Sequence, residues 1–196
     1  MCKYCICKRK EEIQKRVKQI LANLDQDWSI LSQDESIFLY DYVIRKKKWI
    51  SKDKRPIITV TGSRNKTIVF GCLLSRDGKQ LFKQYARFDS SIFVDFLKHL
   101  QTKFGKFIMF VDRATPHCSK FTRQYLDANK DTIRLEYFTV GSPELNAVEE
   151  CWRQGKYHIL SNYYNNFGNL RNTISEYYRT RRFNLDITKY LLRSTK

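Results

Sequence analysis

Residues 107–112 constrain the fold more than any other part of this sequence. They read Phe-Ile-Met-Phe-Val-Asp, five apolar residues in a row followed by one carboxylate. A short continuous apolar run is typical of a strand buried on both faces, as in the parallel part of an α/β sheet. Because a charge inside such a strand would be costly, Asp112 is expected at its C-terminal tip, where open α/β sheets bind ligands. A carboxylate that only caps the next helix fits this segment equally well.

Hydrophobic periodicity and turn residues predict the remaining elements. A basic amphipathic helix is expected at 8–24, and a short strand at 28–34 that also ends in a carboxylate, Asp34. Three strands of an antiparallel meander are expected at 57–61, 67–74 and 81–86, a further strand at 132–140, and helices at 89–104, around 121–126, and at 146–160, 170–182 and 185–192.

A meander followed by strand–helix alternation predicts an α/β fold with a mixed sheet and helices on both faces, the layout of a ribonuclease H-like domain. With 196 residues, the chain is most simply one such domain. We expect residues 28–196 to form it. Residues 1–27 are expected to be a basic helical segment or the remnant of a linker.

The balance of charge favours a polyanionic partner. There are 37 Lys and Arg against 20 Asp and Glu, which gives a net charge of +17. Such an excess repels itself unless a polyanion is near, so nucleic acid is the leading partner class, and a basic surface kept for solubility is the alternative. The sequence contains no apolar stretch of membrane-spanning length and no apolar signal segment, so an intracellular, cytoplasmic protein without a membrane partner is expected.

One basic stretch surrounds Trp49, and this combination suits a phosphate backbone with a stacking contact. A solvated loop explains the same stretch equally well. The candidate DNA-binding residues of this stretch are Arg45, Lys46, Lys47, Lys48, Lys52, Lys54 and Arg55.

The cysteines near the N-terminus form a Cys-x-x-Cys-x-Cys pattern at Cys2, Cys5 and Cys7. A structural zinc site needs four ligands, and no fourth ligand follows closely. Reduced thiols without a metal are therefore the favoured interpretation, because intracellular proteins keep their cysteines reduced.

A third acid is expected from the helix near Asn146. At about 100° per residue, Val148, Trp152, Gly155 and Ile159 form the buried stripe of this helix. Glu149 borders that stripe, whereas Glu150 points away from it into solvent. Glu149 is thus placed to reach an active-site cleft, although Asn146 to Glu149 also fits a capping box in which Glu149 folds back onto the Asn146 amide.

Three carboxylates at one edge of a sheet suit phosphodiester chemistry. Cleavage requires an activated attacking oxygen and a stabilised leaving oxygen, and two divalent ions held by hard oxygen ligands provide both. Three like charges do not crowd together comfortably without such cations. The basic side chains of the chain would hold the DNA backbone while the acids hold the metal.

Three blocks of this sequence resemble those of mariner-type DDE transposases and, most of all, their prokaryotic insertion-sequence relatives. The blocks are QDE at 33–35, VDRATPH at 111–117 and SPELNAVEECW at 142–152. The resemblance implies the ribonuclease H-like fold, Mg²⁺ replaceable by Mn²⁺, and Asp34, Asp112 and Glu149 as catalytic metal ligands. It also implies double-stranded DNA as partner, both element ends and target, with a homodimer assembled on that DNA.

The sequence departs from the family pattern in two places. Ala147 stands where the family usually has Pro, which affects the turn before Glu149 but removes no ligand. Family members also carry N-terminal helix-turn-helix domains that read the element ends, and the 27 residues before Trp28 are too few for such a module. We therefore expect a catalytic domain alone, or one half of a split element with a separate helix-turn-helix subunit.

Each of three further residues near the blocks has two possible roles. His117 is a candidate for contacting a phosphate or supporting the metal ligands, and packing at a helix start is the alternative. Lys156 is a candidate DNA contact, or an exposed helix lysine. Trp152 is expected in the core rather than as a platform for base stacking.

The sequence leaves three functions open. The first is a transposase catalytic domain that cuts and joins DNA strands. The second is a truncated remnant, catalytically inactive, that binds DNA or regulates a full-length transposase. The third is a ribonuclease H-like nuclease acting on RNA–DNA hybrids, which the third block disfavours.

Overall fold

A computed structural model gives the fold, and it describes residues 3–41, 60–75, 78–139 and 141–193. The strands are β1 (Trp28–Leu39), β2 (Lys66–Leu74), β3 (Gln80–Tyr85), β4 (Lys106–Val111) and β5 (Ile133–Tyr137). The helices are α1 (Lys3–Ala22), α2 (Ser90–Phe104), α3 (Thr115–Cys118), α4 (Lys120–Ala128), η1 (Pro143–Leu145), α5 (Val148–Ile159), α6 (Phe167–Thr180) and α7 (Ile187–Leu191).

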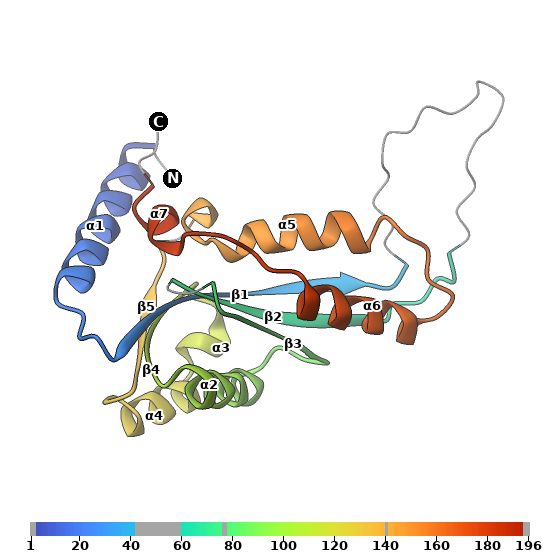
Figure 1. The fold of residues 1–196 in the computed structure, drawn as a ribbon, viewed down its shortest axis with the longest axis horizontal. Helices are drawn as coiled ribbons and strands as arrows, with labels where there is room; N and C mark the ends of the chain where they lie inside the picture. The colour runs from blue at the N-terminus through green and yellow to red at the C-terminus, as the bar shows by residue number, and fades with distance from the viewer. Residues whose placement is uncertain (1–2, 42–59, 76–77, 140, 194–196) are drawn as a thin grey trace.

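The five strands form one mixed sheet in the order β3-β2-β1-β4-β5. β1 lies in the middle, antiparallel to β2 and parallel to β4, while β3 and β5 continue the antiparallel and parallel halves outward. Helices cover both faces, with α5 and α6 on one side and α2, α3 and α4 on the other (Figure 1). The predicted ribonuclease H-like arrangement is confirmed.

The meander is built differently from the prediction. Its first strand is β1 itself, which continues through Asp34 to Leu39 and pairs with β2 along this whole extension. The strand predicted at 57–61 is not found, because residues 57–59 lie outside the described part and Val60 and Thr61 are not in a strand. Asp34 therefore lies inside a long strand rather than at the end of a short one.

Two apolar clusters, one on each face of the sheet, form the core. On the α5 and α6 face, Phe38 and Phe110 pack with the buried residues of those helices. On the α2 face, Phe70, Phe107 and Met109 pack against the apolar stripe of α2. The alternation of side chains along β4 divides its five buried residues between the two clusters, as expected for a strand buried on both faces.

The helix boundaries follow local sequence signals. Asp89 caps α2, since its side chain accepts a hydrogen bond from the Ile92 amide, and Gly105 ends the helix with a φ of 71°. Asn166 and Asp186 cap α6 and α7 in the same way. The helix predicted at 146–160 is interrupted at its start, because the short η1 precedes Asn146 and α5 begins only at Val148.

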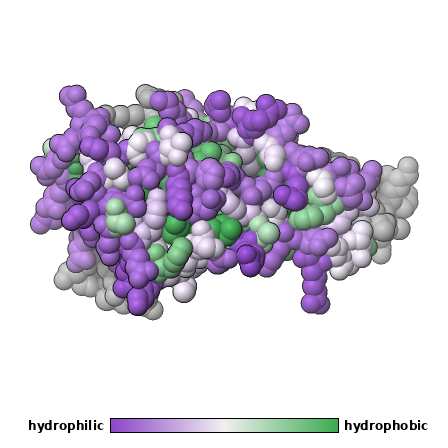
Figure 2. Space-filling view, turned by 90° about the horizontal axis from the view of Figure 1, so that it is seen from below, coloured by the Kyte–Doolittle hydropathy of each residue, from purple (hydrophilic) through white to green (hydrophobic). Residues whose placement is uncertain are grey.

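The N-terminal helix α1 joins the same core. Ile13 and Val17 are buried in the cluster on the α5 face, together with Trp28. Gln14 donates a hydrogen bond to the Arg193 carbonyl, so the helix lies beside the C-terminal end of the described chain, as Figure 1 shows. No described helix is long and apolar enough to cross a membrane. The face on the α2 side is largely hydrophilic, with small hydrophobic patches (Figure 2).

Candidate active site

The register of two parallel strands brings the two aspartates together. The last pair between β1 and β4 is Ser32 with Phe110. Asp34 and Asp112 each follow that pair by two residues, so both lie just beyond the point where β4 ends and β1 continues alone. The aspartates thus share one rim of the sheet, as the sequence predicted, although only Asp112 is at a strand tip.

Asn146 brings the third acid to this rim. Its side-chain oxygen accepts hydrogen bonds from the Ser32 hydroxyl at 2.6 Å and from the Val148 amide at 3.1 Å. Its side-chain nitrogen donates to the Gln33 carbonyl at 3.2 Å. These bonds fasten the first turn of α5, which carries Glu149, to the segment of β1 next to Asp34.

The capping box that competed with an active-site role for Glu149 is not formed. The backbone amide of Asn146 donates to the Pro143 carbonyl instead of to a glutamate side chain. Val148, Trp152, Gly155 and Ile159 are all buried, which confirms the predicted stripe of α5. Glu150 is held by Arg153 and Gln154 rather than pointing freely into solvent.

Asp34, Asp112 and Glu149 line one cavity of about 390 Å³. Its other walls come from the segment after β4, which includes Arg113, and from the loop after β5. Three elements that are distant in sequence therefore present carboxylates to a common space. A cavity of this size admits a short segment of a ligand rather than a whole macromolecule.

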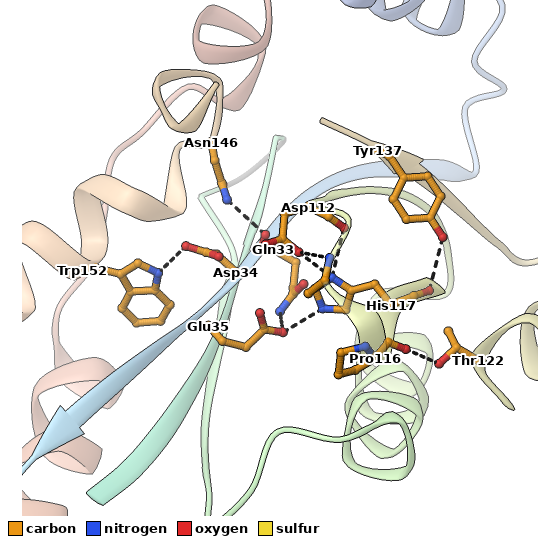
Figure 3. Close-up of polar contacts among 11 residues, drawn as sticks. Gln33, Asp34, Glu35, Asp112, Pro116, His117, Thr122, Tyr137, Asn146 and Trp152 are labelled. Carbon is orange, nitrogen blue, oxygen red and sulfur yellow. Dashed lines mark hydrogen bonds and ion pairs between the residues drawn. The ribbon is translucent and has the colours of Figure 1, made fainter. Parts of the chain in front are cut away.

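Asp34 lies in a setting that disfavours its negative charge. Burial raises the pKa of Asp34, the nearby Glu149 and Glu35 carboxylates raise it further, and the result is a pKa of about 7. Two hydrogen bonds oppose these effects: the Trp152 indole donates to Oδ2 of Asp34 at 2.8 Å (Figure 3), and the Glu35 backbone amide also donates to the carboxylate. Trp152 is buried against the aromatic rings of Phe82 and Tyr178, which confirms its predicted place in the core.

A buried histidine connects the two aspartate-bearing strands. His117 lies between Asp112 and Glu35, with Nδ1 at 2.8 Å from Asp112 Oδ1 and Nε2 at 3.1 Å from Glu35 Oε1 (Figure 3). Burial would lower the pKa of His117, but the hydrogen bonds to Asp112 and Glu35 outweigh it and raise the pKa to about 10. The hydrogen bond from His117 in turn holds the pKa of Asp112 below its usual value.

This placement corrects the prediction for His117 as a DNA contact. The side chain is only 1% exposed and packs on the rings of Phe88 and Phe93, so it has no surface to offer a phosphate. Its position beside Asp112 agrees with the other suggested role, the support of a metal ligand.

The remaining predicted DNA-binding residues divide into two groups. Lys156, on α5, is partly buried, and its Nζ lies 5.9 Å from the centre of the Phe38 ring. The residues of the basic stretch lie outside the described part of the chain: Arg45, Lys46, Lys47, Lys48, Lys52, Lys54 and Arg55.

A second cavity, of about 440 Å³, lies where β3 meets α6. Its lining includes Lys83, Lys103, Arg179 and Arg182, and among the described residues no carboxylate lines it. Burial and the nearby Arg182 lower the pKa of Lys103, which reflects the crowding of positive charge there. This cavity is basic where the other is acidic, so the candidate for metal-dependent chemistry is the carboxylate cavity.

Sequence reasoning does not identify the roles of three residues at the site. The local pattern marks Asn146 only as a helix cap, Glu35 only as the neighbour of Asp34, and Gly71 not at all. The alternation of β1 is the available signal for Glu35, because adjacent residues of a strand face opposite sides of the sheet. No local signal predicts Gly71, whose role depends on a ring that is 81 residues away in sequence.

The donor atoms at the cavity suit a hard divalent cation. Carboxylate oxygens are the ligands that Mg²⁺ prefers, and the raised pKa of Asp34 reflects negative charge that a cation would neutralise. The described residues nevertheless include no group of three His, Cys, Asp or Glu side chains that could hold a metal ion as they stand. Cys5 and Cys7 lie on α1, and Cys2 lies outside the described residues.

Comparison with known proteins identifies relatives of this fold. A paired-end complex of Mos1 transposase with the left transposon end has a TM-score of 0.67 and 12% identity, covering 98% of this chain and 58% of that chain. A Mos1 mariner paired-end complex with Mn has a TM-score of 0.66 and 13% identity, covering 98% and 59%. The Mos1 transposase catalytic domain with Raltegravir and Mg has a TM-score of 0.60 and 11% identity, covering 98% and 89%.

At these identities the solved structures establish the fold, and this chain spans less than two thirds of the longer Mos1 chains. A search of the curated proteins found no match. The family comparison is decisive, because the model described as DDE superfamily endonuclease matches residues 29–171, which is well over half of the sequence and contains Asp34, Asp112 and Glu149. This chain is therefore a member of the DDE superfamily endonuclease family.

Proposed function

We propose that this chain is the catalytic domain of a DNA transposase, which cleaves DNA strands at the ends of an insertion sequence and transfers them to target DNA. The observation that carries the proposal is the shared cavity of Asp34, Asp112 and Glu149 within a member of this family. Residues 28–196 would form the catalytic domain, and residues 1–27 would be a basic helical segment packed on it.

The three carboxylates would hold Mg²⁺, or Mn²⁺ in its place. When bound, such an ion activates the attacking oxygen and stabilises the leaving oxygen of the phosphodiester. Two Mos1 structures contain Mn and Mg, which supports the choice of a divalent cation. The ligands would have to draw together for binding, since the described residues do not form a complete metal-binding group as they stand.

The protein's own residues would keep the carboxylates ready for the cation. The raised pKa of Asp34 allows this half-buried group to remain partly protonated near neutral pH until a cation replaces the proton. His117 and the Ala114 amide both hold Oδ1 of Asp112, which limits the rotation of that carboxylate. Arg113, in the cavity wall, would place a positive charge beside a bound phosphate.

Double-stranded DNA is the proposed partner, as element ends and as target. The net charge of +17 and the basic cavity between β3 and α6 provide for contact with a phosphate backbone. We further propose that two copies act together on DNA, inside the cell, and that a separate helix-turn-helix subunit recognises the element ends. No observation favours the alternatives of an inactive remnant or a nuclease for RNA–DNA hybrids.

The test is the variant Asp112→Asn, assayed for nicking and strand joining on a DNA duplex with Mg²⁺ or Mn²⁺. Loss of both reactions is expected, because the amide cannot serve as an anionic ligand. Binding to the same duplex, measured by fluorescence anisotropy, should be unchanged. Unchanged cleavage by this variant would refute the proposed function.

A further inference from the structure

We propose that Trp152 is a positioning residue for the carboxylate of Asp34, and that Gly71 provides the space that makes this possible. The inference rests on the proposed function, since it assigns a role to a residue that acts through Asp34. The central contact is the hydrogen bond from the indole Nε1 to Asp34 Oδ2 at 2.8 Å, which Figure 3 shows.

The indole can orient Asp34 but cannot replace it. An indole carries a single N–H donor and no acceptor, so it binds one carboxylate oxygen and cannot itself hold a cation. A hydrogen bond to a carboxylate is charge-assisted and therefore stronger than a neutral one. Because one oxygen of Asp34 is fixed by this bond, the orientation of the whole carboxylate relative to the cavity is fixed as well.

The sheet is built to admit the indole at this point. Gly71 is the partner of Asp34 in the register between β1 and β2. A Cβ atom on Gly71 would lie 2.5 Å from Cη2 of Trp152 and 2.6 Å from Cε1 of Phe82, distances that real Cβ contacts do not show. The absence of a side chain at residue 71 thus opens a slot that the indole fills directly beside Asp34.

Aromatic packing holds the indole within this slot. The ring of Trp152 meets those of Phe82 and Tyr178 edge to face, with centroids 5.6 Å apart in each pair. Tyr178 reaches this position because α5 carries Gly155, where any Cβ would collide with the hydroxyl and Cζ of Tyr178. The ring therefore has little freedom to turn its N–H away from Asp34.

A purely structural role makes a different prediction. If Trp152 matters only as a core side chain, Trp152→Phe should have little effect on the binding of the cation, because most of the ring contacts are kept. If the N–H positions Asp34, Trp152→Phe should impair the binding of the cation even when the fold is intact. The matched control is Trp28→Phe, which makes the same change at a buried tryptophan outside the carboxylate cavity.

The experiment measures Mn²⁺ binding to the purified full chain by electron paramagnetic resonance of free Mn²⁺, without DNA or turnover. We expect Trp152→Phe to weaken Mn²⁺ binding by about 10- to 100-fold, the range found when partners of metal ligands are removed. Trp28→Phe should bind Mn²⁺ as the unsubstituted chain does. Equal affinity of Trp152→Phe and the unsubstituted chain would overturn the positioning role.

A second measurement does not require Trp152→Phe to fold. In the ¹⁵N-labelled chain with all three tryptophans present, Asp34→Ala should move the indole N–H resonance of Trp152 and speed its exchange with solvent, while the Trp28 resonance stays in place. An unmoved Trp152 resonance would also overturn the inference. Loss of Mn²⁺ binding in Asp34→Ala, with none in Trp152→Phe, would refute the positioning role but keep the proposed function. Unchanged Mn²⁺ binding in Asp34→Ala would refute both.

Discussion

The sharpest structural prediction concerns Gly71→Ala. A single methyl group at this position would meet Trp152 and Phe82 at 2.5 and 2.6 Å, and neither ring can withdraw easily because both are packed against Tyr178. Forcing extra volume into a well-packed core typically costs about 1–3 kcal/mol. At about 2–4 °C per kcal/mol for a chain of this size, the melting temperature should fall by roughly 2–12 °C.

Thermal and urea denaturation, followed by circular dichroism, would measure this loss. The matched control is Gly168→Ala in α6, where the new Cβ would meet only the tip of the Asn166 side chain at 3.1 Å. There the loss should be smaller than at Gly71, because a shift of a few tenths of an ångström by Oδ1 of Asn166, which caps α6, relieves the contact, and alanine favours the helix over glycine by up to about 1 kcal/mol. If Gly71→Ala is as stable as the unsubstituted chain, or if both variants lose the same amount, the slot beside Asp34 is not a constraint on packing.

Three other predictions concern the charged groups. His117→Gln should lower the free energy of unfolding by about 3–5 kcal/mol at pH 6, since it leaves the Glu35 carboxylate buried without its cationic partner, and adding Glu35→Gln should recover part of this loss. Because the pKa of His117 is about 10 in the folded chain and 6.5 is its ordinary value, the loss should shrink as pH rises toward 10. A loss that does not change with pH in urea titrations would contradict the ion pair. Asp34→Asn should gain stability over the unsubstituted chain by about 3 kcal/mol between pH 4.5 and 8 and then level off, because the half-buried carboxylate has a pKa of about 7 in the folded chain but its ordinary value of 3.8 when unfolded. A stability difference that stays constant with pH in metal-free urea titrations would refute this. Lys156→Ala should weaken DNA binding and reduce the slope of log affinity against log salt concentration by about 1. An unchanged slope would show that Lys156 does not contact DNA and only packs on Phe38.

Much of the fold follows from local patterns in the sequence. The apolar run of β4, the stripe of α2 and the caps at Asp89 and Gly105 correspond to single elements whose signals lie within about 15 residues. Helical periodicity also distinguishes Glu149, which lines the carboxylate cavity, from Glu150, which does not, although Glu150 is the less exposed of the two rather than the more exposed one as predicted. Three candidate ligands can therefore be named from the sequence alone, with the spacing of the family's blocks as support.

The end of a strand is predicted wrongly from the sequence when pairing with a neighbouring strand decides where the strand ends. The sequence predicts that the first strand ends at Asp34, because a carboxylate is expected at the tip of a short strand rather than inside it. In the fold Gln33 donates to Glu35, Trp152 donates to Asp34, and pairing with β2 carries the strand on to Leu39. The polar residues in the middle of β1 thus belong to the site and do not mark the end of the strand, so a local pattern does not predict that β1 is the first strand of the meander.

The sequence by itself determined the class of fold and the positive charge and named three candidate acids, because periodicity, composition and short motifs are properties of neighbouring residues. Only the tertiary structure decided how those acids are held: Asn146 fastens α5 to β1, His117 is enclosed between Asp112 and Glu35, and Trp152 fills the space beside Gly71. Each of these contacts joins residues that are distant in the chain, and each depends on a distance or a packing constraint that no local pattern encodes.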